Sequence, residues 1–85
     1  MKKVDFRKIE IDLVSGEKEV VDFSKIFGNA LFTQAKTFEV HELGRSIWKD
    51  GEVELKDEDV KILEEQIPQI FPTYIVRTAL LNAIK

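Results

Sequence analysis

The chain has 85 residues, of which 34% are charged and 44% hydrophobic, and its formal net charge is −3. This length predicts a single domain, residues 1–85, near the lower limit of what one hydrophobic core supports. The sequence contains no cysteine and one histidine, which excludes disulfide bonds and a structural zinc site of the usual kind.

The first residues and the hydropathy pattern give no sign of export or membrane insertion. Residues 1–6 contain two lysines followed by Val4, Asp5 and Phe6, so they lack the apolar run of a signal peptide. No apolar stretch approaches the roughly 20 residues that a membrane-spanning helix needs. We therefore expect a cytoplasmic protein without membrane contact, and no motif predicts a cofactor or a metal ion.

Residues 1–23 have the alternating pattern of a β-hairpin around a Ser-Gly turn. The apolar members of the pattern are Ile9, Ile11, Leu13, Val21 and Phe23. A two-residue loop would place charges opposite apolar side chains, whereas a three-residue loop at 14–16 sets Ile9 opposite Val21. We therefore predict the three-residue loop, with Gly16 in the left-handed conformation that such loops require.

Two further alternating segments bear on the predicted sheet. Val4 and Phe6 have the opposite parity to Ile9, which indicates a bulge or a change of strand partner near Arg7. Residues 52–55 alternate acidic and apolar side chains, as a short strand with one buried face does. This strand is a possible third strand of the hairpin, which needs one for stability in water.

Residues 24–50 are predicted to be helical. Ser24 is a natural N-cap, because its hydroxyl oxygen can accept a hydrogen bond from an unpaired amide of the first turn. Gly28-Asn29 is expected to interrupt the helix after one turn, with a fresh start near Asn29. Gly51 follows Asp50 and is the expected left-handed C-cap of the segment.

From Ala30 onward the apolar residues fall on two stripes. Leu31, Ala35 and Phe38 form the first stripe, and Val40, Leu43 and Ile47 form the second. Because the stripes are rotated by more than a quarter turn, either the helix breaks near Lys36-Thr37 or one helix is buried on two sides. The break contains neither glycine nor proline, so we favour one long, kinked helix.

Residues 51–85 add the short strand and two helices. Three consecutive carboxylates at 57–59 oppose the positive end of a helix dipole and mark a helix start. Pro68 is expected to stop this helix at about Ile67, and Pro72 suits the start of a last helix over roughly residues 73–84. The predicted fold class is α+β, with an N-terminal β-hairpin, a possible short third strand, a long middle helix and two C-terminal helices.

One stripe of the middle helix combines aromatic and cationic side chains. Phe38, His41, Arg45 and Trp48 lie at i, i+3, i+7 and i+10, on a single face. This composition is typical of a protein interface. In the alternative interpretation Phe38 and Trp48 belong to the core, with Arg45 stacked on the indole and His41 at the rim. The sequence leaves both interpretations open.

Tyr74 and Leu81 lie seven residues apart, away from the apolar face of the last helix. In one interpretation Tyr74 shields its ring on the preceding loop and Leu81 is a single exposed leucine, which is ordinary. In the other, the two residues form a second contact face for a symmetric partner.

Residues 50–67 hold eight acidic and two basic side chains. This charge repels a phosphate backbone and disfavours nucleic acid as the main partner. The alternative is a helix-turn-helix regulator whose last helix presents Thr73, Tyr74, Arg77 and Thr78 to DNA. An enzyme is not expected, because His41-Glu42 lacks the second histidine of a zinc-protease helix, which position 45 would supply, and no phosphate-binding glycine loop occurs.

From Ser24 onward the order of short motifs resembles small uncharacterised bacterial proteins of prophage type. The motifs are Gly28-Asn29-Ala30, Gln34-Ala35-Lys36-Thr37, His41-Glu42-Leu43-Gly44-Arg45, Gly51-Glu52-Val53-Glu54-Leu55 and, after an acidic helix, Ala79-Leu80. The resemblance implies a non-enzymatic, oligomeric protein encoded near phage assembly genes, and it assigns no functional residue. We therefore predict a small interaction protein that binds itself, as a dimer, or another protein. The candidate interface residues are Phe38, His41, Arg45, Trp48, Tyr74 and Leu81.

Overall fold

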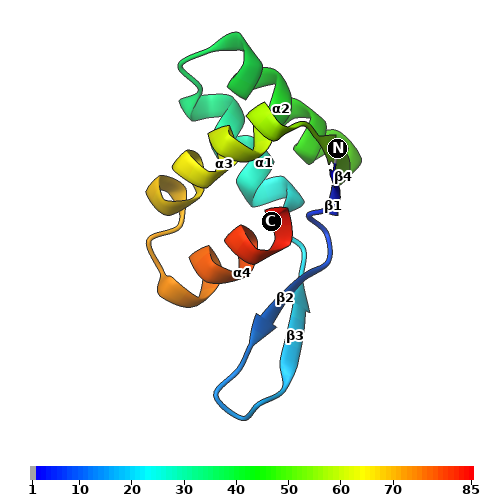
Figure 1. The fold of residues 1–85 in the computed structure, drawn as a ribbon, viewed down its shortest axis with the longest axis vertical. Coiled ribbons are helices and arrows are strands. Elements are labelled where there is room, and N and C mark those ends of the chain that lie inside the picture. Colours follow the sequence, from blue (N-terminus) through cyan, green and yellow to red (C-terminus); the bar gives the residue numbers. More distant parts are fainter. Residues whose placement is uncertain (1) are drawn as a thin grey trace.

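A computed structural model describes residues 2–85. The chain has the predicted α+β fold, with strands first and helices after (Figure 1). Its elements are β1 (Lys2–Asp5), β2 (Ile9–Asp12), β3 (Lys18–Val21), α1 (Ser24–Gln34), α2 (Phe38–Asp50), β4 (Glu52–Leu55), α3 (Asp57–Ile70) and α4 (Tyr74–Ile84).

The β2–β3 hairpin confirms the predicted register. Ile9 lies opposite Val21, and the Leu13 amide donates to the Glu17 carbonyl at 2.8 Å, so the loop holds three residues. Gly16 has φ of +90°, which only glycine adopts at little cost. The hairpin projects beyond the helices and makes the molecule longer in one direction, 41 Å against 23 and 21 Å (Figure 1).

The predicted strand at residues 52–55 is confirmed as β4, but its predicted place as third strand of the hairpin is wrong, because β4 pairs with β1 instead. These two strands form a separate antiparallel ribbon in which Val4 faces Val53. The predicted change of partner near Arg7 is confirmed. The Arg7 amide and Nε donate to Asp5 Oδ1 at 3.0 and 2.9 Å, and this turn lets Val4, Phe6 and Ile9 all reach the core despite their parity.

The middle segment consists of two helices. The predicted single kinked helix is therefore wrong, and the alternative, a break near Lys36-Thr37, is confirmed. Residue Ala35 is extended, with ψ of 132°, and Thr37 caps α2 by accepting the Val40 amide at 3.3 Å. The chain folds back on itself, so that Leu31 of α1 and Val40 and Ile47 of α2 are all buried, whereas Phe38 of the first stripe is exposed. Gly51 ends α2 with φ of +76°, as predicted.

Helix α1 runs through the interruption predicted at Gly28-Asn29. Gly28 is buried there against Gly44 of α2, so it serves close packing and not a break. At the start of the helix, Ser24 does not act as the predicted N-cap acceptor. Its amide and hydroxyl instead donate to Asp22 Oδ1 at 2.9 and 2.6 Å, so Asp22 supplies the capping oxygen.

Helix α3 begins at Asp57 as predicted, but the predicted stop at Ile67 is wrong. The helix continues through Pro68 to Ile70, and the Phe71 amide then donates to the Ile67 carbonyl at 2.8 Å. Pro68 removes one helical hydrogen bond, to the Glu64 carbonyl. Because both residues are exposed, water can satisfy that carbonyl, and the helix tolerates the loss.

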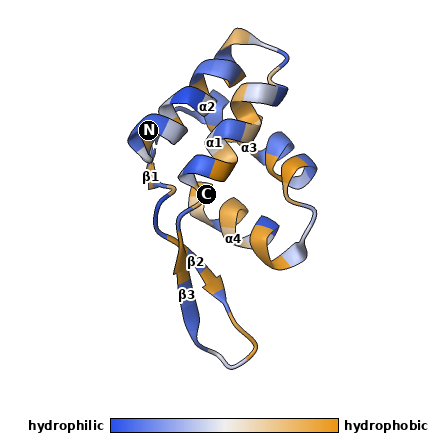
Figure 2. Ribbon diagram, turned by 180° about the vertical axis from the view of Figure 1, so that it is seen from behind, coloured by the Kyte–Doolittle hydropathy of each residue, from blue (hydrophilic) through white to orange (hydrophobic). Residues whose placement is uncertain are grey.

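Helix α4 closes the core against the hairpin and α3. Leu80 and Ile84 are fully buried, whereas Ile75, also predicted on the apolar face, is 40% exposed. The ring of Phe27 links the two halves of the core, with centroids 5.5 Å from Phe6 and 5.7 Å from Phe71. Figure 2 shows the hydrophobic colouring concentrated in α4 and at the hairpin tip, while α2 is more hydrophilic.

Candidate functional site

The predicted stripe of α2 lies at the surface. Phe38 is 74% exposed and Trp48 is 49% exposed, so the interpretation that places both in the core is wrong. The side chains of His41 and Arg45 are also accessible, at 35% and 58%. All four predicted residues therefore reach solvent from one helix.

Helix α1 adds an aromatic residue that the sequence analysis missed. The ring of Phe32 stacks on the imidazole of His41, with centroids 3.9 Å apart and planes inclined by 29°. His41 Nδ1 lies 3.2 Å from the Phe32 carbonyl oxygen, a contact that holds the imidazole against α1 in the helix hairpin formed by α1 and α2. A signal in the sequence could have predicted this pairing. Gly28 and Gly44 lie the same number of residues before and after Lys36, as two glycines that meet in a helix hairpin folded at Lys36 must.

Two cations stack on aromatic rings of the site, and Arg45 does not stack on the ring that was predicted for it. The predicted stacking of Arg45 on the indole is wrong, since its guanidinium lies 5.5 Å from the Phe32 centroid. Arg45 Nε also donates to Glu42 Oε2 at 3.2 Å. It is Lys25 that covers the indole, with Nζ 3.8 Å from the Trp48 ring centroid. Lys25 Nζ further donates to the Trp48 carbonyl at 2.8 Å, and so joins the start of α1 to the end of α2.

These side chains surround a shallow groove of about 450 Å³, which we term the cationic groove. Its lining residues are Gly28, Asn29, Phe32, Arg45, Trp48 and Lys49. A Cβ atom on Gly28 would lie 2.7 Å from the Trp48 Cβ, so the absence of a side chain there permits the close approach that shapes the groove. Aromatic walls with a cationic rim favour an apolar or aromatic side chain flanked by carboxylates.

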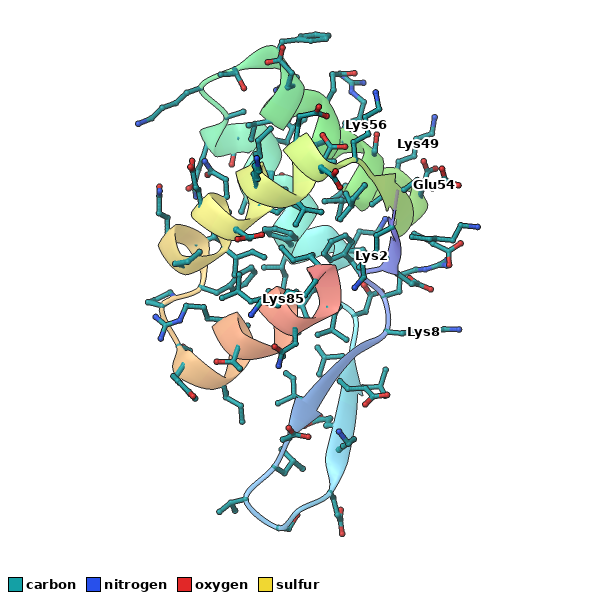
Figure 3. All side chains as sticks on the ribbon, in the orientation of Figure 1. Lys2, Lys8, Lys49, Glu54, Lys56 and Lys85 are labelled. Atoms are coloured by element: carbon teal, nitrogen blue, oxygen red, sulfur yellow. The ribbon has the colours of Figure 1, made fainter. Side chains whose placement is uncertain are left out.

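Phe38 lies at the first position of α2 and lines a different depression, of about 550 Å³. The carboxylates that line it belong to Glu39, Glu42, Asp50, Glu52, Glu54 and Asp59. The two depressions occupy neighbouring sides of α2. Figure 3 shows Lys49 of the cationic groove and Glu54 of the acidic depression projecting outward on the same side of the molecule.

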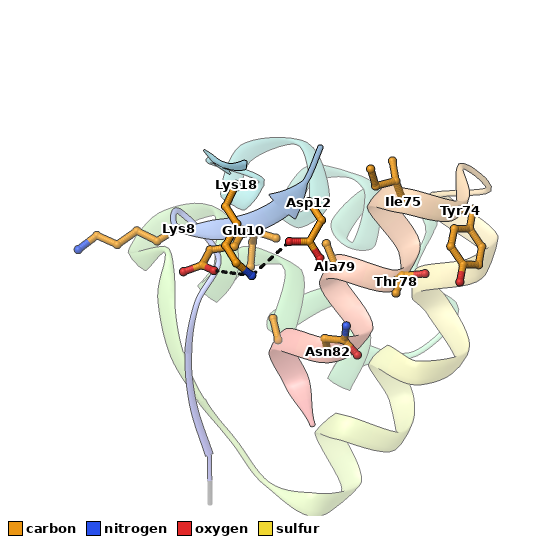
Figure 4. A pocket seen from close by; sticks show the side chains of 11 residues that line it. Lys8, Glu10, Asp12, Lys18, Tyr74, Ile75, Thr78, Ala79 and Asn82 are labelled. Carbon is orange, nitrogen blue, oxygen red and sulfur yellow. Dashed lines mark ion pairs between the residues drawn. The ribbon is translucent and has the colours of Figure 1, made fainter. Parts of the chain in front are cut away.

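The structure does not bring Tyr74 and Leu81 onto one exposed face. Leu81 is partly buried and packs against the core, whereas Tyr74 is 72% exposed beneath the guanidinium of Arg77, 5.7 Å from its centroid. Tyr74 lines a groove of about 670 Å³ between α4 and β2 (Figure 4). The other wall carries Lys18, which pairs with Asp12 at 3.2 Å and Glu10 at 3.7 Å.

Within residues 2–85, no three histidine or carboxylate side chains lie close enough together to hold a metal ion. In the same range no helix has both the length and the apolar character required to span a bilayer. Comparisons with protein-family models, curated proteins and solved structures find no match to this chain.

Proposed function

We propose that this chain is a small, non-enzymatic interaction protein that associates with itself through the cationic groove. The observation that carries the proposal is Trp48, a half-exposed indole that is held in place and surrounded by cations. Tryptophan and arginine are the residues in which interface binding energy concentrates. Because Lys25 and the helix hairpin fix the ring before any partner arrives, binding would cost little side-chain entropy.

The sequence itself supplies the probe that tests this proposal. Trp48 is the only tryptophan, so its fluorescence reports on the cationic groove alone. We expect light scattering to give a mass above that of one chain, and the Trp48 emission to shift to longer wavelength as dilution exposes the indole.

The Trp48→Ala variant should scatter as a single chain at concentrations where the wild type is associated. Ile26→Ala is the matched control, because Ile26 is 60% exposed on α1 and does not line the groove. A wild type that remains a single chain at its highest soluble concentration would reject self-association. A Trp48→Ala variant that keeps the wild-type mass would move the contact elsewhere.

A helix-turn-helix regulator is the second candidate function. Its support is the short connection between α3 and α4 and the exposed Tyr74, on which the partly buried Arg77 stacks. The acidic first turn of α3 opposes it, because those carboxylates repel phosphates. Binding to a mixed-sequence DNA duplex at low salt, weakened by salt and by Arg77→Ala, would favour this function over the first.

The proposed cellular location and biological role are based on the sequence. A chain without cysteine suits the reducing cytoplasm, where we place the protein. The resemblance to prophage-type proteins supports an assembly or accessory role for the self-associated form.

A further inference from the structure

The exposed residues of α2 follow the spacing of a helix-pairing seam. Phe38, His41, Arg45 and Trp48 are separated by three, four and three residues, which is the a–d pattern of a coiled coil. In the folded chain Phe32 and Lys25 of α1 flank this seam on one side, and its other side faces solvent. A seam of this kind lacks a second helix to complete it.

The two halves of α2 carry opposite charge. Residues 38–43 contain Glu39 and Glu42 as their only fully charged side chains, whereas residues 44–49 contain Arg45 and Lys49. Lys25 adds a further cation at the Trp48 end, and Asp50 closes the helix with one carboxylate. Of the carboxylates in the acidic depression, only Glu42 forms an ion pair within residues 2–85. The acidic half of one helix is therefore complementary to the basic half of another.

We propose that the partner is a second copy of this chain, which pairs its α2 antiparallel to the first about a two-fold axis. This inference rests on the proposed function and adds the orientation of the contact. In the antiparallel arrangement an a position packs against a d position of the other helix. Phe38 of each copy thus lies opposite Trp48 of the other, and His41 lies opposite Arg45.

The arrangement fills the cationic groove at both ends of the seam. Phe38 is the most exposed aromatic residue of the chain, and its neighbours Glu39 and Glu42 are acidic. A phenyl ring flanked by carboxylates matches the aromatic walls and cationic rim around Trp48. Between the two ends, each Glu42 can bridge the arginines of both copies, so the central polar layer keeps paired charges.

A parallel pairing would lose this match. It would set Phe38 against Phe38 and the acidic halves against each other, and like charges across a contact are repulsive. The antiparallel and parallel orientations can be distinguished by experiment, because positions 38 and 48 of one helix are separated by about 15 Å along its axis.

Cysteine crosslinking distinguishes the two orientations, since the chain has no cysteine of its own. The experiment mixes the full-length variants Phe38→Cys and Trp48→Cys in equal amounts under mild oxidation. One end of the mixed pair brings the two cysteines together, and the other end keeps an intact Phe38–Trp48 contact. We expect a disulfide-linked dimer from the mixture, and little from either variant alone.

The controls make each outcome decisive. Val20→Cys mixed with Trp48→Cys should give little crosslinking, because Val20 is 60% exposed on the remote hairpin. Crosslinking of Phe38→Cys alone, or none in the mixture, overturns the antiparallel pairing. In those cases the proposed function still stands if the wild type associates and Trp48→Ala does not. If the wild type does not associate at all, both proposals fail together.

Discussion

Gly28 of α1 and Gly44 of α2 approach so closely that a Cβ on either would lie 2.8 Å from the carbonyl oxygen of the other. The obstructing atoms belong to the backbone, so they cannot rotate aside. This contact holds the two helices together where the chain folds back, and it determines how far Trp48 stands from α1. The shape of the cationic groove therefore depends on the absence of a side chain at Gly28 and at Gly44.

We expect Gly28→Ala and Gly44→Ala each to lower the free energy of unfolding by about 1–2 kcal/mol. Overpacking costs about 1–3 kcal/mol, and the better helix propensity of alanine returns about 0.5–1 kcal/mol. Urea denaturation measures the change. Asn29→Ala is the control, because Asn29 is exposed in the same helix and should lose no stability. A Gly44→Ala variant as stable as the wild type would show that the helices can move apart freely.

Replacing Pro68, unlike replacing the two glycines, is expected to raise the free energy of unfolding. It lies inside α3 at an exposed position, where its ring and missing amide cost one helical hydrogen bond. Replacing it by alanine restores the bond, although the more flexible unfolded chain offsets part of the gain. We expect Pro68→Ala to raise the free energy of unfolding by about 1–2 kcal/mol.

Thermal and urea unfolding of Pro68→Ala test this expectation. Gln69→Ala, at the next exposed position of the same helix, controls for helix propensity and should change stability by less than half as much. If Pro68→Ala is less stable than the wild type, the proline instead contributes by restricting the unfolded chain or by directing the turn into Phe71.

Local chemistry in the sequence was enough to predict several features of the fold. Parity alone gave the pairing of Ile9 with Val21, because one face of the hairpin must be apolar. Gly51 was predictable as a cap because few other residues adopt its φ of +76°. These features depend on neighbours within a few residues, so the sequence carries their full cause.

The errors in strand pairing and in the middle helix come from contacts between residues that are distant in the sequence. The pairing of β1 with β4 joins Val4 to Val53, and two four-residue strands contain no signal that selects the partner. The break after Gln34 occurs without glycine or proline, because folding back buries both Leu31 and Ile47. The candidate site was incomplete for the same reason. Phe32 could be placed beside the stripe only once the helix hairpin was known.

Lys25 provides a test of how the site is held together. Its ammonium group stacks on the Trp48 ring and donates to the Trp48 carbonyl, so it fastens the end of α2 to α1. We expect Lys25→Ala to lower the free energy of unfolding by about 0.5–1 kcal/mol and to shift the Trp48 emission to longer wavelength. Lys49→Ala is the control, since Lys49 lines the same groove but stacks on no aromatic ring within residues 2–85. Equal effects of the two variants would contradict a specific role for Lys25.

The last prediction concerns acid stability and the start of α1. The amide and hydroxyl of Ser24 donate to Asp22 Oδ1, and these hydrogen bonds hold the pKa of the Asp22 carboxyl below its ordinary value of 3.8. A carboxyl whose pKa is lower in the folded state stabilises the fold above that ordinary value. The contribution is then lost as the pH falls below 3.8, through the lowered pKa.

We therefore expect Asp22→Asn to be less stable than the wild type at pH 6, with the difference shrinking as the pH is lowered toward 2. Thermal unfolding at a series of pH values measures it. Ser24→Ala removes the hydroxyl donor and keeps the amide donor and the acceptor, so its deficit should shrink over the same range. The Asp5 carboxyl, whose pKa the Arg7 guanidinium lowers through a side-chain hydrogen bond, titrates in both proteins and cancels in the comparison. A deficit that stays constant down to pH 2 would mean that the charge of Asp22 contributes nothing to the cap.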